Sequence, residues 1–417
     1  MESWKLNMRI WFGGLLLCCV LLHPAFAQND WTQWRGANRD GVASVSVPDE
    51  WPDALTQVWK MPVGEGHAGP LVADGKVFVF ARQGEQEVVS CFELQTGKGI
   101  WTQKYDAPYE INSAASGHGK GPKSTPALFA GKVYTLGIGG ILSCFDTLTG
   151  KQVWQHAFAD QFDGALPLYG TAMSPLVVNG MLIAHVGGDD NGALMAFDAE
   201  TGKMRWTWSE DGPGYASPIL ATLDGVPQVV TQTQNACVSV ALDTGDLLWK
   251  IPFATAWYQN AITPVVFQER VIFSGLEKGT AAYRPVRDGD RWTVDPIWEN
   301  DNVSMYMSSP VLHEGVLYGL AHTQKGHFFA LDAKDGTLFW QSKGRQSDQV
   351  LMVRVGDMLM CQKEDGTLLM LRASKEKFEP VAEYTVADSP TWAPPAVIDN
   401  HVLVKDKTHV TLWRVKK

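Results

Sequence analysis

The sequence predicts an all-β fold, an eight-bladed β-propeller with four antiparallel strands in each blade, and three observations lead to it. A hairpin phrase that ends in Trp recurs along the chain. Short apolar strands precede each copy of the phrase. The Trp residues at positions 59, 101, 154, 206, 249, 298 and 340 are separated by 42, 53, 52, 43, 49 and 42 residues. Four short strands fill a unit of that length, which is typical of a propeller blade.

The hairpin phrase carries an acid, a Gly four residues later and a Trp eight residues later. Full copies end at Trp101, Trp154, Trp206 and Trp340. Ala241 to Trp249 is a copy shortened by two residues, and Tyr283 to Trp298 has a longer hairpin. We interpret Leu371 to Tyr384 as a further copy, with Tyr in the place of Trp.

A second element precedes each phrase: a small residue and Pro, an apolar run, a Gly turn and another apolar run. Thr125-Pro126 and Val133 to Leu136 are one example. The runs are short and rich in β-branched and aromatic residues, which indicates strands. No stretch of the mature chain has a convincing helical period.

The repeated residues are expected to have structural roles. The glycines supply positive φ in the hairpin between the third and fourth strands, and the acids Asp146, Asp198 and Asp332 accept hydrogen bonds from the turn. Each Trp is expected to pack a large flat face against the next blade. These repeat residues are Gly97, Gly150, Gly202, Gly336, Trp101, Trp154, Trp206, Trp249, Trp298 and Trp340.

Two fragments remain after seven complete blades. Leu55 to Trp59 offers a Trp strand without the three strands before it, and Pro395 to Val415 offers three strands without a Trp strand. We therefore predict that the two chain ends form an eighth blade together, because closure removes the exposed sheet edges of a lone fragment.

Residues 1–27 are predicted to be a signal peptide. Lys5 and Arg9 precede the apolar run Ile10 to Leu22, and Ala25-Phe26-Ala27 fits the small-x-small cleavage rule. Residues 28–417 are expected to form one propeller domain, exported to the periplasm or secreted, with no transmembrane segment after cleavage. Cys18 and Cys19 lie inside the apolar run, and Leu17 does not suit a lipidation motif, although association with the outer membrane stays open.

Composition excludes some classes of function. The net charge is −10 and no basic run occurs, which argues against nucleic-acid binding. The four cysteines of the mature chain, Cys91, Cys144, Cys237 and Cys361, are far apart in the sequence and show no metal-ligand spacing. We interpret them as small buried residues, with a disulfide as the open alternative.

The hairpin phrase resembles the repeat of the pyrroloquinoline-quinone (PQQ) propeller superfamily, and Trp31 to Gly41 resembles the start of exported bacterial proteins of this type. The resemblance covers essentially the whole mature chain and implies the propeller fold. It implies either a quinoprotein alcohol or sugar dehydrogenase or a non-catalytic binder similar to the BamB subunit of the outer-membrane assembly machinery.

The dehydrogenases of this superfamily hold PQQ beside a calcium ion, with an Asp base and typically a disulfide between adjacent cysteines. The single Cys-Cys pair here, Cys18-Cys19, lies in the signal peptide. Other motifs are weak. Gly117 to Ser124 has Pro122 where a phosphate loop requires Gly, Gly187 to Gly192 suits a tight hairpin better than a calcium loop, and His322 and His327 merely flank a hairpin. We assign no catalytic residue and no metal site.

Loops that precede the small-Pro strands should meet at one mouth of the axial funnel. Aromatic and polar groups on a concave surface suit a small molecule or a peptide. The candidate binding residues on these loops are His67, His118, Lys123, Tyr169, Tyr215, Trp257, Tyr258, Tyr306, Arg345 and Trp392.

From these patterns we expect a monomeric, exported, BamB-like propeller that acts as a binding or scaffold protein in the cell envelope, without a cofactor. Its partner would be an envelope protein or peptide, or a small ligand in the funnel. A PQQ-dependent dehydrogenase with calcium is the alternative.

Export gives the first testable prediction. Signal peptidase should cut after Ala27, so N-terminal sequencing of the protein from the periplasm should find Gln28 first. A retained Met1 or a lipid on Cys18 would contradict this prediction.

Overall fold

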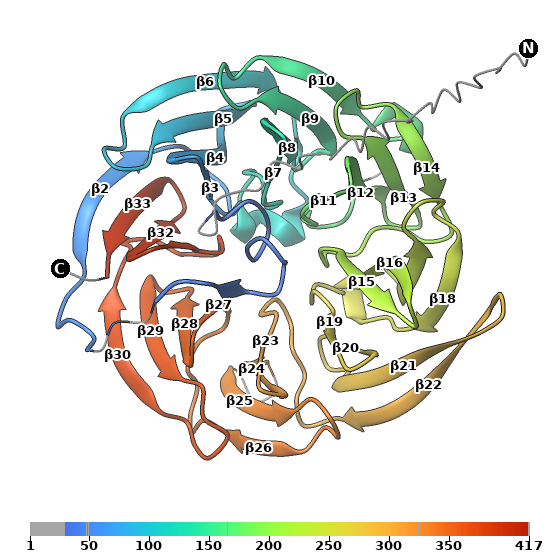
Figure 1. The fold of residues 1–417 in the computed structure, drawn as a ribbon. Helices are drawn as coiled ribbons and strands as arrows, with labels where there is room; N and C mark the ends of the chain where they lie inside the picture. The colour runs from blue at the N-terminus through green and yellow to red at the C-terminus, as the bar shows by residue number, and fades with distance from the viewer. Residues whose placement is uncertain (1–29, 47, 49, 165, 323–325, 416–417) are drawn as a thin grey trace, which may run out of the picture.

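The computed structural model describes residues 30–46, 48, 50–164, 166–322 and 326–415. The predicted signal peptide lies outside the described residues. Eight antiparallel sheets of four strands each surround a central axis, which confirms the eight-bladed propeller (Figure 1). Within the described part of the chain, helix is limited to three short 3-10 turns.

Blades 1 to 4 follow one another in the chain, each running from its inner to its outer strand. Their strands are, in blade 1, β3 (Leu71–Ala73), β4 (Lys76–Gln83), β5 (Gln86–Glu93) and β6 (Gly99–Asp106); in blade 2, β7 (Ala127–Phe129), β8 (Lys132–Leu136), β9 (Ile141–Asp146) and β10 (Gln152–Ala157); in blade 3, β11 (Leu176–Val178), β12 (Met181–Gly188), β13 (Asn191–Asp198) and β14 (Met204–Trp208); in blade 4, β15 (Ile219–Leu223), β16 (Val226–Gln232), β17 (Ala236–Ala241) and β18 (Leu247–Pro252).

Blades 5 to 7 continue the ring. Their strands are, in blade 5, β19 (Val265–Phe267), β20 (Arg270–Ser274), β21 (Thr280–Asp288) and β22 (Arg291–Asn300); in blade 6, β23 (Val311–His313), β24 (Val316–Ala321), β25 (His327–Asp332) and β26 (Leu338–Gln341); in blade 7, β27 (Val350–Val355), β28 (Met358–Lys363), β29 (Thr367–Arg372) and β30 (Pro380–Thr385). The short strand β1 (Val42–Ala43) adds to β27 in parallel. The 3-10 turns are η1 (Ser113–His118), η2 (Asp160–Phe162) and η3 (Ala256–Tyr258).

Blade 8 is built from both ends of the chain, as the sequence predicted. The strands β31 (Ala396–Ile398), β32 (His401–Lys405) and β33 (His409–Arg414) come from the C-terminal part, and β2 (Thr56–Pro62) comes from the N-terminal part. The strand β2 pairs antiparallel with β33, with Thr56 opposite Arg414 and Trp59 opposite Leu412. No sheet edge is left unpaired at the junction of the two ends.

Five of the Trp residues dock on a glycine of the next blade. Trp249 instead donates its indole N–H to the side chain of Gln228 in its own blade, and Trp340 donates to the carbonyl of Ser374. Trp101 donates its indole N–H to the carbonyl of Thr147 at 3.0 Å, and Gly150 lies against its ring. A Cβ built on Gly150 would come within 2.6 Å of the Trp101 ring, so only glycine fits. The same pairing joins Trp59 to Gly97, Trp154 to Gly202, Trp206 to Gly245 and Trp298 to Gly336. The φ angles of the predicted glycines Gly97, Gly150, Gly202 and Gly336 lie between 70° and 75°.

The interpretation of Tyr384 as the replacement for Trp is wrong. Ala382, opposite Met370, occupies the position that Trp fills in the other blades. The reason lies in the ring closure. The third and fourth strands of blade 8 come from opposite chain ends, so no hairpin joins them and a Trp of blade 7 would have no hairpin to cover. Tyr384 instead donates its hydroxyl to the carbonyl of Pro52 at 2.8 Å.

A hydroxyl belt joins the inner ends of the blades. The amide of Gly69 donates to the hydroxyl of Thr125, the amide of Thr125 to Ser174, and the amide of Ser174 to Ser217, at 2.9 to 3.0 Å. The hydroxyl residues that precede Pro in blades 2, 3, 4 and 6, namely Thr125, Ser174, Ser217 and Ser309, therefore each satisfy a buried amide of the preceding blade. Such buried amides must find partners near the axis.

The described cysteines are buried free thiols, as their interpretation as small core residues required. Burial raises the pKa of Cys91 and of Cys144 to about 12, so both thiols stay protonated at neutral pH. Within the described chain there is no helix with the length and apolar character needed to cross a membrane.

The docking of Trp101 on Gly150 can be separated from backbone strain by a matched pair of substitutions. Gly75 has nearly the same φ as Gly150, at 69° against 71°, but nothing lies within 4 Å of its Cβ position. Gly75→Ala should therefore lose only the advantage of glycine at positive φ, about 1–2 kcal/mol. Gly150→Ala should lose about 1–3 kcal/mol more in urea unfolding, because the new methyl overlaps the Trp101 ring. Equal losses would show that the docking contact contributes nothing.

The ring closure is tested by a cross-link. Thr56→Cys and Arg414→Cys place thiols on directly opposite positions of β2 and β33, and the native thiols in the described part of the chain are buried. The double variant should form a disulfide on mild oxidation, seen as a mobility shift without reductant, whereas each single variant should not.

Deletion from Thr391 onward should cause aggregation, because it leaves β2 without its partner. A soluble truncated protein that melts like the full chain would contradict the closed ring.

Candidate functional site

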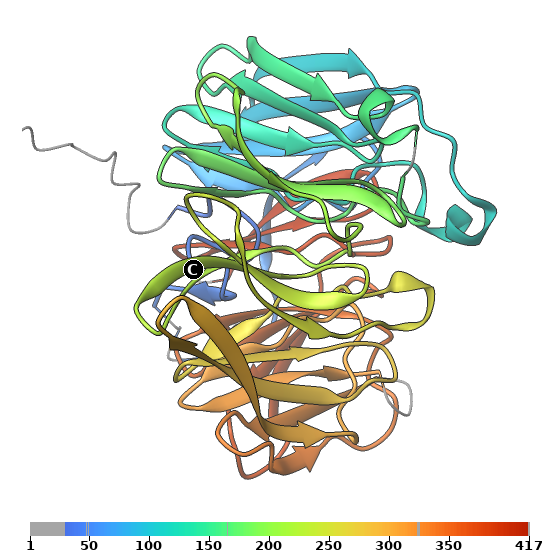
Figure 2. The same ribbon diagram turned by 90° about the vertical axis from the view of Figure 1, so that its right-hand side faces the viewer.

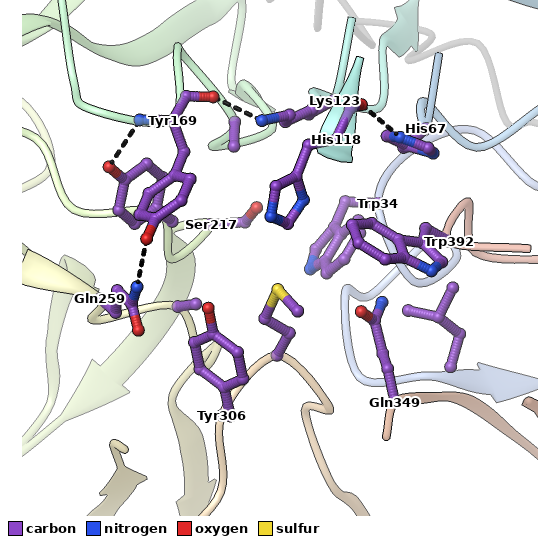
Figure 3. Close-up of a pocket in the computed structure, with 15 residues that line it drawn as sticks. Trp34, His67, His118, Lys123, Tyr169, Ser217, Gln259, Tyr306, Gln349 and Trp392 are labelled. Carbon is purple, nitrogen blue, oxygen red and sulfur yellow. Dashed lines mark hydrogen bonds between the residues drawn. The ribbon is translucent and has the colours of Figure 1, made fainter. Parts of the chain in front are cut away.

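The funnel cavity lies on the axis and has a volume of about 130 Å³. Most of its residues come from the loops that join the outer strand of one blade to the inner strand of the next, since those loops meet around the axis (Figure 3). Trp34 comes from the N-terminal segment, and Leu351 lies on β27. Its fifteen lining residues are Trp34, His67, His118, Lys123, Tyr169, Ala172, Tyr215, Ser217, Gln259, Ala261, Tyr306, Met307, Gln349, Leu351 and Trp392.

The structure brings seven of the ten candidate residues to this cavity: His67, His118, Lys123, Tyr169, Tyr215, Tyr306 and Trp392. The other three lie outside its lining. Trp257 and Tyr258 belong to η3, where both adopt positive φ, and Trp257 is 71% exposed. Arg345 forms an ion pair with Asp348 at the surface. All three residues lie on loops that join the outer strand of one blade to the inner strand of the next, but their side chains are not part of the cavity lining.

Aromatic rings form one continuous wall. The ring centroids of His118 and Trp392 are 4.7 Å apart with their planes at 64°, and those of His67 and Trp392 are 5.1 Å apart. His118 also contacts Tyr169 at 5.5 Å, and Tyr169 contacts Tyr215 at 5.8 Å. In Figure 3 the His118 ring points into the middle of the cavity. Such flat faces at several angles suit a planar or ring-shaped ligand.

Hydrogen bonds fix this wall. His67 Nε2 lies 2.9 Å from the carbonyl oxygen of His118, so it carries a proton and donates it. Gln259 donates its amide N–H to the hydroxyl of Tyr169 at 2.9 Å, and the Tyr169 amide donates to the hydroxyl of Tyr215 at 3.2 Å. The ligand surface is therefore formed before any ligand binds, which lowers the entropy cost of binding.

Lys123 is the cation of the cavity lining, and none of the fifteen lining residues is Asp or Glu. Its ammonium donates to the carbonyl of Tyr169 and lies 6.0 Å from the centre of the Tyr169 ring. An ammonium has three N–H donors. Two donors of Lys123 have no acceptor among the hydrogen bonds of the described residues.

Burial sets the charge states of these groups. It lowers the pKa of Lys123 to about 8, so the ammonium is mostly charged at neutral pH. Burial lowers the pKa of both His67 and His118 to about 4, and the charge of Lys123 adds to the effect on each. Both imidazoles are therefore neutral at pH 7, and the net charge of the lining is positive.

A second lysine lies behind this wall. Lys405 is fully buried, and its ammonium donates to the carbonyls of Gly66 and Asp406. Burial lowers its pKa to about 7, and its charge adds to the lowering of the His67 pKa. Lys405 does not line the cavity, but it raises the potential there.

The lining does not fit the calcium ion that accompanies the quinone in the centre that the superfamily resemblance implies. Calcium takes six to eight oxygen ligands, with carboxylates prominent among them, whereas the oxygens here belong to Tyr, Ser and Gln side chains. No cluster of three or more His, Cys, Asp and Glu side chains suited to a metal occurs among the described residues. The segment Gly187 to Gly192 forms the hairpin between β12 and β13, as expected.

Sequence reasoning missed several lining residues. Trp34 comes from the N-terminal segment, which no repeat pattern explains. Ser217 belongs to the hydroxyl belt, and Gln259 directly follows Tyr258. Ser217 could have been predicted from the sequence, because it is the residue before Pro218 and residues at that position of the repeat lie near the axis.

The repeated hairpin phrase, the four-stranded blades and the docking Trp residues together define a propeller of the PQQ-like repeat class. A family model described as outer membrane protein assembly factor BamB matches residues 85–342 and 295–404. The chain therefore belongs to the BamB-like family of PQQ-like propellers.

The similar proteins include both assembly factors and quinoprotein dehydrogenases. The chain is 24% identical over 331 residues to the outer membrane protein assembly factor BamB of Yersinia pestis, covering 75% of this chain and 68% of that protein. It is 32% identical over 184 residues to a quinohemoprotein alcohol dehydrogenase of Comamonas testosteroni, covering 43% of this chain. That match spans only 24% of the dehydrogenase.

Solved structures show the same fold. BamB from Moraxella catarrhalis superposes with a TM-score of 0.63 at 15% identity, over 87% of this chain and 98% of that one. The quinohemoprotein alcohol dehydrogenase from Comamonas testosteroni gives a TM-score of 0.65 at 16% identity, over 93% of this chain and 80% of that one. At these identities the likeness concerns the fold alone, and the site must decide the function.

Proposed function

We propose that this propeller is a non-catalytic binding protein of the cell envelope, and that its funnel binds a small planar ligand with an acidic group. One observation carries the proposal: an aromatic-walled cavity whose lining holds a lysine and no carboxylate. The rings give a planar ligand apolar contact, and the two remaining N–H donors of Lys123 provide partners for its anionic group. The acidic end of a peptide bound in the funnel would meet the same groups.

The matching family model, described as an outer membrane protein assembly factor, also supports a binding role. The assembly factors named among the relatives support a scaffold role. The dehydrogenases named among the relatives support the alternative, a PQQ-dependent dehydrogenase, because PQQ is also an acidic planar molecule. The lining, however, lacks the carboxylates that a calcium ion and a general base would require.

The ligand class is tested with two probes of equal shape, 2-naphthoate and 2-naphthamide, in calorimetric titrations. The acid should bind about tenfold more tightly than the amide, because a hydrogen bond to a charged group is worth more than one to a neutral group. Lys123→Met should remove this preference and leave the affinity for the amide within about twofold. Lys120→Met, on the same loop but outside the lining, is the matched control.

The preference should also depend on pH. Lys123 has a pKa lowered to about 8 and is charged below that value, so the preference for the acid should be present at about pH 6.5 and lost at about pH 9.5. The imidazoles of His67 and His118 are neutral throughout this range, and Tyr169 is the other titratable side chain beside the ammonium. Lys405 titrates near pH 7, but its effect would persist in Lys123→Met, which separates the two lysines.

Equal affinities for the acid and the amide would contradict the proposal. The same protein should be titrated with PQQ and calcium and assayed for alcohol-dependent reduction of a dye. Calcium-dependent quinone binding together with dye reduction would establish the dehydrogenase instead.

A further inference from the structure

The N-terminal segment 31–43 lies across the axial channel. In Figure 1 it occupies the centre of the ring, and in Figure 2 it lies on the side of the molecule opposite to η1. The segment therefore occupies the end of the channel opposite to the mouth at which η1 stands.

The segment contacts six of the eight blades near their inner strands. Its main-chain and side-chain partners are Val72 in blade 1, Leu128 in blade 2, Ser174 and Pro175 in blade 3, Thr263 in blade 5, Pro310 in blade 6 and Arg354 in blade 7. Its main chain joins blade 1 through two hydrogen bonds between Trp31 and Val72, each 2.9 Å long.

Two arginines hold the segment from within. Arg39 is 3% exposed and donates to the carbonyls of Ser174 and Pro175, each at 2.9 Å. Arg35 is 5% exposed and donates to the carbonyls of Asp40 and Pro310. Burial lowers the pKa of Arg35 to about 10 and that of Arg39 to about 9, so both remain charged at neutral pH. Since buried charges are costly without partners, these carbonyls fix the segment in one position.

Trp34 divides the space along the axis. It lines the funnel cavity, and together with Trp31 and Arg35 it lines a second, smaller cavity. Its indole N–H donates to the hydroxyl of Thr263 at 2.9 Å, which fixes the ring across the channel. In Figure 3 Trp34 and Trp392 form one side of the funnel cavity.

We propose that residues 31–43 are a built-in plug that closes the channel, and that Trp34 is the floor of the funnel and contacts its ligand. Arg35 and Arg39 are positioning residues that hold this floor. The plug makes the funnel a pocket with one entrance, on the η1 side. The ligand contact of Trp34 rests on the proposed function, whereas the closure of the channel does not.

Closure is tested without any ligand. Val353 is 2% exposed. It lines the smaller cavity that Trp31, Trp34 and Arg35 also line, but it does not line the funnel cavity. In Val353→Cys the new thiol should react very slowly with a methanethiosulfonate reagent, and the native thiols are buried. Adding Arg39→Gln or Trp34→Ala should raise the reaction rate at least about tenfold, because the plug opens locally. Adding Arg284→Gln, an exposed arginine on β21, should leave the rate unchanged.

Circular dichroism and melting must show that the tested variants are folded. If Arg39→Gln does not fold, Trp34→Ala alone decides, since it leaves both buried charges in place. Unchanged thiol rates in folded Trp34→Ala and Arg39→Gln would overturn the plug.

The floor is tested with 2-naphthoate. Trp34→Ala should weaken its binding about tenfold through the lost ring contact, while Trp34→Phe should retain most of the affinity. Equal affinity in Trp34→Ala and the unchanged protein would overturn the ligand contact. If the unchanged protein binds neither naphthoate nor naphthamide, the proposed function fails, and the thiol rates still decide whether the plug exists.

Discussion

The contact between a Trp and the glycine of the next blade, which recurs at five of the blade junctions, is the constraint on which the ring depends. A large indole ring needs a neighbour without a Cβ, and a hairpin at positive φ supplies it. The indole N–H also needs an acceptor, and the carbonyls of the neighbouring hairpins accept it in Trp59, Trp101, Trp154, Trp206 and Trp298. Each contact fixes one blade relative to the next, so the diameter of the ring and the width of its channel follow from them.

Two features occupy the space around the axis of the ring. The hydroxyl belt satisfies the amides at the inner strand ends, and the N-terminal segment fills one end of the axis with Trp31, Trp34 and two arginines. The other end stays open and becomes the funnel cavity. The site is thus a consequence of how the ring is closed, and its lysine and aromatic side chains occupy loops on which the fold itself places few demands.

The repeat could be predicted from sequence because its residues are under local constraints. Gly150 must be glycine for its φ and for Trp101, and the same two demands recur at fixed spacing, so the pattern is visible in one chain. The bulge before each Trp could not be predicted. Ile100, for example, is skipped between the pairs Phe92–Gly99 and Cys91–Trp101, and 46% of its surface is exposed. Such a bulge depends on the twist of the whole sheet rather than on a residue type.

The funnel was predictable in part. His67, His118, Lys123 and Trp392 were found because topology sends their loops to one mouth. Trp257 lies outside the cavity lining although its loop is of the same kind, because loop membership does not determine the direction of a side chain. Trp34 was missed because contacts between its segment and six blades determine its position. No local sequence pattern reveals contacts of that kind.

The most direct test of the binding account is anomalous diffraction from crystals soaked with a brominated naphthoate. The account predicts a bromine peak inside the funnel, among the rings of Trp34, His118 and Trp392, with the carboxylate within hydrogen-bond distance of Lys123 Nζ. A carboxylate directed away from Lys123, or bromine bound at other surfaces with none in the funnel, would contradict it.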